Sequence, residues 1–232
     1  MRRAWRFLLG AALLAAGCAQ VPPAAPPAAV RPGAPDLDAA YYRDAARRGA
    51  KVFQVEPGDS LLVARVYRGG ALARLGHDHV VSSREPHGFI DADKGRADLS
   101  VAVESLAVDD PAQRAAAGFD STPSESDIAG TRSNMLEKVL EAERFPFVVL
   151  RVRSVAQGVL EAEVSLHGVT RPVRIPAKID SGGERIDASG SFAINQSDFG
   201  IEPFSVLGGA LAVQDRIDLS FAIRAVRITD AM

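Results

Sequence analysis

The sequence has almost no cysteine, no strong excess of charge and no long run of apolar residues. Cys18 is the only cysteine among 232 residues, so no disulfide can stabilise a domain within one chain. The 27 basic and 29 acidic residues give a formal net charge of -2, without the basic excess typical of nucleic-acid-binding proteins. Beyond the first 18 residues, no apolar stretch reaches the roughly 20 residues that a membrane-spanning helix needs. We therefore expect a domain stabilised by its apolar core, which 47 % hydrophobic residues can fill.

Sequence motifs of common enzyme classes are also missing. There is no Gly-x-Ser-x-Gly elbow of a serine hydrolase, and Ser191 has no histidine and acid partners visible nearby. The glycine pairs at 69–70, 182–183 and 208–209 form neither a dinucleotide-binding fingerprint nor a P-loop. No catalytic residue is predicted, and we expect that the protein is not an enzyme.

The first 18 residues have the layout of a bacterial export signal. A basic start, Met-Arg-Arg-Ala-Trp-Arg, is followed by an apolar run over 7–16 and then by Gly17-Cys18. The segment 14–18, Leu-Ala-Ala-Gly-Cys, resembles a lipobox, with Cys18 as the lipidated residue. A plain signal peptide and a short buried helix are the alternatives. A lipoprotein would be exported and anchored to a bacterial membrane, with its folded domain facing the periplasm.

The chain after the signal divides into three parts. Residues 19–35 are rich in proline and alanine, a composition that favours an extended, semi-rigid linker over a packed domain. Residues 36–50 can form a short helix that Asp36 or Asp38 caps and Gly49 ends. Residues 51–229 then form one folded domain.

Alternating apolar and polar residues dominate this domain and predict an all-β fold. About eight antiparallel strands, each with one apolar face, must close or stack, and closure into a lipocalin-like barrel removes exposed strand edges. A barrel of this size is either filled by side chains or holds one small ligand, and the pattern does not distinguish the two. The predicted strands are Lys51–Val55, Ser60–Tyr67, His77–Ser83, His87–Asp93, Ala97–Val108, Phe147–Gln157, Val159–His167, Arg171–Ile179, Arg185–Ile194 and Arg216–Ile228.

One helix interrupts the strands. The segment 122–125, Thr-Pro-Ser-Glu, is a capping box with Thr122 as the N-cap and Glu125 at the third helical position. The helix must end before Pro146. Its apolar stripe at helical spacing consists of Ile128, Met135 and Val139.

Four segments together resemble the YceI-like family of small exported bacterial β-barrels. They are Val-Phe-Gln-Val-Glu at 52–56, Glu-Arg-Phe-Pro-Phe at 143–147, Leu-His-Gly-Val-Thr-Arg-Pro-Val at 166–173 and Ser-Asp-Phe-Gly-Ile at 197–201. The resemblance implies a lipocalin-like barrel over 51–229 with a helix between strands. It further implies an apolar tunnel that holds a long polyisoprenoid chain, such as a quinone tail. The family has no defined catalytic set, so no catalytic residue is carried over.

Strand alternation selects the residues that would line such a tunnel. Side chains two apart on a strand point to the same face, and the apolar set is expected to point inward. The predicted ligand-binding wall consists of Leu160, Val164, Val173, Ile175, Phe192, Leu219 and Phe221. The apolar segment 202–214 is expected to be partly a strand or a lid, and it could close one end of the tunnel.

The histidines suggest a second site. His77 and His79 are two apart, so on a strand both point to one face, and His87 could lie beside them across a hairpin. Two or three imidazoles that meet in this way could bind zinc or copper. Alternatively, the pair lies at the barrel mouth and contacts a polar head group, or is simply solvated.

The sequence therefore predicts an exported lipoprotein that holds an apolar isoprenoid-type ligand and contacts the membrane through its anchor. Two alternatives stay open. One is a metal-binding or redox-linked protein built on His77, His79 and His87. The other is a ligand-free barrel that acts through a protein partner.

Overall fold

The computed structural model describes residues 33–156 and 158–229. The signal, Cys18 and most of the linker lie outside the described residues. The strands are β1 (Val52–Val55), β2 (Leu61–Gly69), β3 (His79–Ser83), β4 (His87–Asp91), β5 (Arg96–Ala102), β6 (Ala107–Val108), β7 (Phe147–Ala156), β8 (Val159–Leu166), β9 (Val169–Gly182), β10 (Arg185–Asn195), β11 (Ser205–Val206) and β12 (Leu211–Arg227). The helices are α1 (Ala39–Arg47), α2 (Pro111–Ala117), α3 (Glu125–Asn134) and the π-helix η3 (Met135–Val139), with 3-10 turns η1 (Ala73–Leu75), η2 (Val103–Ser105), η4 (Gln196–Phe199) and η5 (Leu207–Gly209). Among these residues, no helix is both long and apolar enough to cross a membrane.

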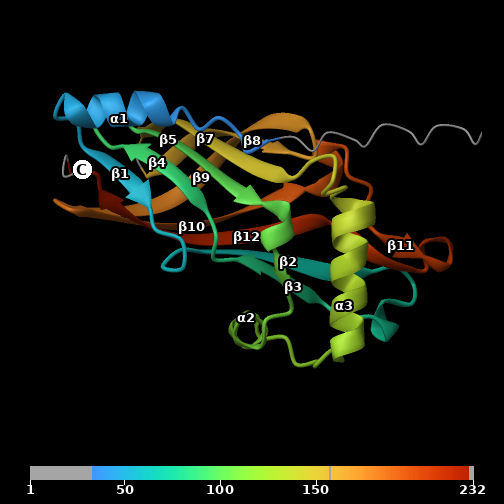
Figure 1. Ribbon diagram of the computed structural model, residues 1–232. Helices are drawn as coiled ribbons and strands as arrows, with labels where there is room; N and C mark the ends of the chain where they lie inside the picture. Colours follow the sequence, from blue (N-terminus) through green and yellow to red (C-terminus); the bar gives the residue numbers. More distant parts are fainter. Residues whose placement is uncertain (1–32, 157, 230–232) are drawn as a thin grey trace, which may run out of the picture. The chain divides into compact units, whose positions relative to one another are not determined.

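The strands form a closed antiparallel barrel, as predicted (Figure 1). The last strand, β12, pairs with β10 on one side and with β1 and β2 on the other. The strands β4 and β5 continue the sheet from β1, while β3 and β6 continue it from β2. The pairs β1–β2, β4–β3 and β5–β6 therefore act as three bent strands, which makes eight strands around the barrel.

A buried serine hydrogen-bonds to the backbone where the strand is interrupted between β1 and β2. Ser60 is fully buried, and its hydroxyl donates to the Glu56 carbonyl at 2.9 Å and accepts from the Arg224 amide at 3.0 Å. This hydroxyl replaces a ladder hydrogen bond that the turn over 56–60 interrupts. The first strand can therefore bend without leaving a buried amide unpaired.

The hairpin between β8 and β9 shows a register detail that the sequence pattern missed. The predicted strands Val159–His167 and Arg171–Ile179 leave a turn at 168–170, but the turning residues are His167 and Gly168, with φ angles of 51° and 75°. Two successive positive φ angles are those of a tight two-residue hairpin turn. A Cβ on Gly168 would lie 2.6 Å from the ring of Phe145, so this position requires glycine for packing as well.

Helix α1 covers the outside of the barrel over β1 and β4 (Figure 1). Tyr42 is fully buried, stacks on Phe89 with ring centroids 5.3 Å apart, and donates its hydroxyl to Asp98 at 2.8 Å. Burial and the bond to Asp98 both raise the pKa of Tyr42 well above its ordinary value, so this phenol stays neutral. The helix spans Ala39–Arg47, within the predicted 36–50, and its aromatic face fixes it to the barrel, but the Asp38 side chain makes no capping hydrogen bond.

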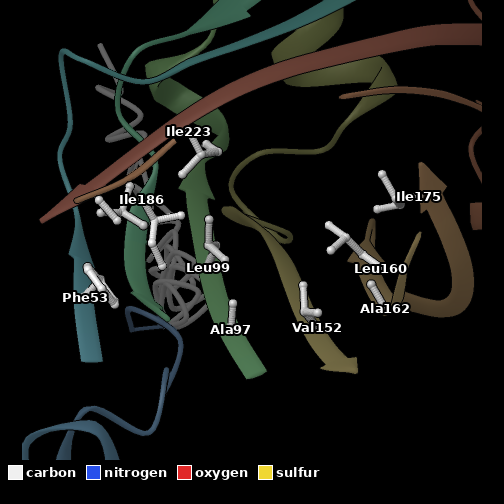
Figure 2. Packing of buried hydrophobic residues seen from close by; sticks show 11 residues of the cluster. Phe53, Ala97, Leu99, Val152, Leu160, Ala162, Ile175, Ile186 and Ile223 are labelled. Carbon is white, nitrogen blue, oxygen red and sulfur yellow. The ribbon is translucent and has the colours of Figure 1, made fainter. Parts of the chain in front are cut away.

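The main apolar cluster lies inside the barrel. Figure 2 shows labelled side chains that come from separate strands, among them Leu99, Leu160, Ile175, Ile186 and Ile223. All five are at least 92 % buried. Along each strand, every second side chain points inward, and these five residues occupy such inward positions.

Helix α3 begins two residues later than predicted. Ser124, and not Thr122, is the N-cap: its Oγ accepts from the Asp127 amide at 3.2 Å, and the Asp127 carboxylate accepts from the Ser124 amide at 3.1 Å. The sequence contains two overlapping capping boxes, Thr122 with Glu125 and Ser124 with Asp127. The pattern alone does not choose between them.

Replacing Ser124 with alanine should therefore destabilise the protein by about 1 kcal/mol, the typical contribution of an N-cap side chain. The matched control is Thr122→Ala, which removes the hydroxyl of the other capping box and should leave stability nearly unchanged. Urea denaturation of both variants measures the difference. Equal losses, or a larger loss for Thr122→Ala, would contradict the assignment of the cap.

Candidate functional site

The barrel encloses a cavity of about 630 Å³. Its walls are mainly aliphatic and aromatic, and they come from strands all around the barrel, including β5, β8, β9, β10 and β12. A volume of this size lies within the range of small-molecule sites. The interior is therefore open, which decides the question that strand alternation left unanswered.

Six of the seven predicted wall residues line this cavity. They are Leu160, Val164, Ile175, Phe192, Leu219 and Phe221. Val173 is not among the lining residues, and neither is Ala162, its partner across the β8–β9 ladder. Val173 is partly buried and packs against both the main apolar cluster and the cluster of Val164, Phe199 and Ile201. Six of the predicted wall residues thus line the cavity and Val173 does not, while contact with a ligand stays a prediction.

The cavity extends toward both ends of the barrel. At one end it is lined by residues next to hairpin turns, with Gly95, Val155 and Ile179 among them. At the other end it reaches α3, which crosses the barrel there (Figure 1), through Thr131 and Asn134. Residues within the predicted lid 202–214 also line the cavity. They are Phe204, Val206, Leu211, Ala212 and Val213. The segment is partly strand, as expected, because β11 pairs with the start of β12.

His79 belongs to the inner face of β3 near the α3 end. It pairs with Val66 across the β2–β3 ladder and lines the cavity. Its Nδ1 lies 2.6 Å from Oδ2 of Asp109, a fully buried carboxylate. The imidazole is thereby held in one orientation from behind the cavity wall.

Asp109 is fixed by two further donors. The Val80 amide donates to Oδ1 at 3.0 Å, and Nη1 of Arg114 donates to the same oxygen at 2.6 Å. Burial would raise the pKa of Asp109, but the hydrogen bonds from His79, Val80 and Arg114 outweigh it and lower the pKa below its ordinary value. Asp109 is therefore ionised, and Arg114 balances its charge. The sequence reasoning missed both residues, although Asp110-Pro111 is a recognisable start for α2, which carries Arg114.

His77 also lines the cavity but precedes β3, which begins at His79 and not at His77 as predicted. The His77 and His79 ring centroids are 6.4 Å apart. Nδ1 of His77 is buried, and among the described residues it has no hydrogen-bond partner. Both histidines thus line the cavity, although His77 lies outside the strand on which the spacing argument relied.

His87 does not join them. Its side chain is 62 % exposed, its closest acidic neighbour is Glu85 at 4.0 Å, and it is not part of the cavity lining. His79 and Val81 face the cavity from β3, whereas Ile90 faces it from β4 and Phe89 packs outside. Odd-numbered residues therefore point inward on β3, whereas even-numbered residues point inward on β4. His87 has an odd number and so points outward. Within 33–156 and 158–229, no group of three or more His, Cys, Asp or Glu could hold a metal ion.

Comparison with known proteins gives a consistent result. Residues 76–225 match the YceI-like domain. One solved structure with this fold is a polyisoprenoid binding domain from Saccharophagus degradans, which is 12 % identical, with a TM-score of 0.55 over 76 % of this chain and 98 % of that chain. Another is BcnA from Burkholderia cenocepacia, which is 14 % identical, with a TM-score of 0.54 over 74 % of this chain and 99 % of that chain. No curated protein matches the sequence. Because the match covers most of the chain, this protein belongs to the YceI-like domain family.

Proposed function

We propose that this protein binds the apolar chain of a polyisoprenoid inside its barrel. The observation that carries the proposal is the cavity of about 630 Å³, which is lined by inward-facing apolar side chains and extends toward both ends of the barrel. A long, narrow hydrocarbon fits such a space better than a compact polar molecule does. The Saccharophagus degradans structure with the same fold is described as a polyisoprenoid binding domain, which supports the proposal.

Burial of apolar surface would drive this binding. Each CH₂ group transferred from water to an apolar site contributes about 0.8 kcal/mol, so a few isoprene units are enough for substantial affinity. The aliphatic wall offers few hydrogen bonds, so most of the cavity would select for apolar character and shape. We further propose a binding protein and not an enzyme.

The location of the protein is a second part of the proposal. The lipobox-like segment 14–18 supports lipidation at Cys18, and the Pro/Ala-rich residues 19–35 would act as a spacer. The barrel would then stay near a bacterial membrane that supplies its ligand, on the periplasmic side. This arrangement rests on the sequence alone.

Mass spectrometry of the full chain, purified natively from the membrane fraction, tests both parts. We expect a stoichiometric isoprenoid in the organic extract and a mature N-terminus at Cys18 that carries a lipid. An extract without isoprenoid, even after incubation with isoprenoid-containing vesicles, would contradict the binding proposal. An unmodified Cys18 would contradict only the anchor.

A further inference from the structure

Polar residues line the cavity in several places, and five of them gather at its α3 end. Arg68, His77 and His79 line the cavity from β2 and the start of β3, and Thr131 and Asn134 line it from α3. Around Leu99 the lining is mainly aliphatic. A polar head placed at the α3 end would meet these five side chains.

The tautomer of His79 follows from its contacts. Asp109 is ionised and accepts hydrogen bonds at both carboxylate oxygens, so Nδ1 of His79 must carry the proton of the 2.6 Å bond. In the neutral imidazole, Nε2 then has a lone pair and no proton. Among the described residues, no partner hydrogen-bonds to Nε2, although the ring lines the cavity.

The surroundings of Asp109 explain why this ring is held so firmly. Asp109 does not line the cavity and is reached from behind the wall by Arg114, whose side chain is only 6 % exposed. An ordinary core histidine would have both ring nitrogens satisfied by protein groups or would be solvated. Here one nitrogen is fixed by a buried ion pair, and the other is left for whatever occupies the cavity.

We propose that Nε2 of His79 accepts a hydrogen bond from a hydroxyl on the head of the bound isoprenoid. The ligand then lies with its head at the α3 end and its tail directed toward the hairpin at Gly95. The ligand class is an isoprenoid that carries a hydroxyl, either a prenyl alcohol or the reduced form of a quinone. This inference rests on the proposed isoprenoid function and adds a head-group preference and a direction to it.

Calorimetric titration of the delipidated full chain with two matched compounds tests the inference. Geranylgeraniol has a hydroxyl that can donate, and geranylgeranyl methyl ether has the same tail without a donor. Wild-type protein should bind the alcohol about tenfold more tightly, the effect of about one net hydrogen bond. In His79→Phe the ratio should fall to about one, mainly through weaker binding of the alcohol.

Two further variants keep the test sharp. His79→Asn retains a side-chain N–H that can reach Asp109 but has no group at the Nε2 position, so it should lose discrimination while the Asp109 network persists. His87→Phe makes the same substitution as His79→Phe at an exposed histidine outside the cavity, so it should keep the wild-type ratio. Unchanged binding of the ether by each variant shows that its cavity is intact.

A second pair of ligands separates the two sources of the hydroxyl. A quinone with a short isoprenoid tail is titrated in its oxidised and reduced forms, and a preference for the reduced form that disappears in His79→Phe would assign a quinol. Equal binding of alcohol and ether by wild-type protein, or an unchanged ratio in His79→Phe and His79→Asn, would overturn the inference but leave the isoprenoid proposal standing. If wild-type protein bound none of these compounds, the isoprenoid proposal would fail, and this inference with it.

Discussion

Replacing Leu219 with tryptophan should abolish isoprenoid capture and leave the barrel folded. Leu219 lies on β12, lines the cavity, and is paired with Phe192 on β10 and Ala64 on β2. An indole at this position would occupy space that the isoprenoid chain needs. Excluding four CH₂ groups costs about 3 kcal/mol, so we expect affinity to fall by about 100-fold or more. The affinity for geranylgeraniol, measured by calorimetry, checks this.

The matched control is Ala222→Trp, three residues further along the same strand. Ala222 is exposed on the outer face, where it is paired with Ser189. It adds the same ring outside the barrel and should bind isoprenoid as wild-type protein does. Similar circular dichroism spectra for both variants would show that they fold. Capture by Leu219→Trp at wild-type affinity would show that the ligand does not use this cavity.

Replacing Arg114 with methionine should have the largest effect on stability. The Arg114 and Asp109 side chains are 6 % and 0 % exposed, and their charged atoms are 2.6 Å apart. Methionine leaves the Asp109 carboxylate buried without its cation. Breaking a buried pair in this way typically costs about 3–5 kcal/mol. Urea denaturation at pH 7 measures the loss.

Arg224→Met is the control because Arg224 makes ion pairs in a more exposed setting. Its side chain is 40 % exposed and lies 3.0 Å from Asp187 and 3.4 Å from Asp59. Exposed pairs contribute at most about 1 kcal/mol, so this variant should unfold at nearly the wild-type urea concentration. Comparable losses for the two arginines would contradict the assigned role of the buried pair.

The pH dependence gives an independent check on Arg114. The folded-state pKa of Asp109 is lower than its value of about 3.9 in the unfolded chain. The stability from its ionised form is therefore present above about pH 4 and is lost as the pH falls through the folded-state pKa. The Arg114→Met penalty should be largest at neutral pH and shrink in acid, where Asp109 becomes protonated.

The barrel was predictable from sequence because one face of each strand packs against apolar groups and the other faces water. Apolar and polar residues therefore alternate along each strand. That alternation located six cavity residues, including Phe192 and Leu219, without any structural information. Val173 packs against two apolar clusters and does not line the cavity, because inward orientation does not say whether the space ahead is empty or filled. Cavities depend on packing between distant segments, which a local period does not encode.

The histidine site shows a second limit. His77 and His79 both line the cavity, but spacing could not anticipate that the inward-facing positions change from odd residue numbers on β3 to even ones on β4, which turns His87 outward. Asp109 was invisible to pattern reasoning because its role depends on a contact across 30 residues. Asp109 can be identified as the hydrogen-bond partner of the His79 ring only when the positions of both residues in the fold are known.

Closure of the barrel between its first and last strands has a consequence for folding speed. Phe53 on β1 is paired with Arg227 on β12, so the joining contact spans nearly the whole domain. Contacts between residues so far apart in sequence slow folding, because the entropy of a large loop must be lost before they form. Until β12 is available, the free edges of β1 and β10 also stay open to pairing with other chains. The barrel is therefore expected to fold slowly and late, only after its C-terminal strand has been synthesised.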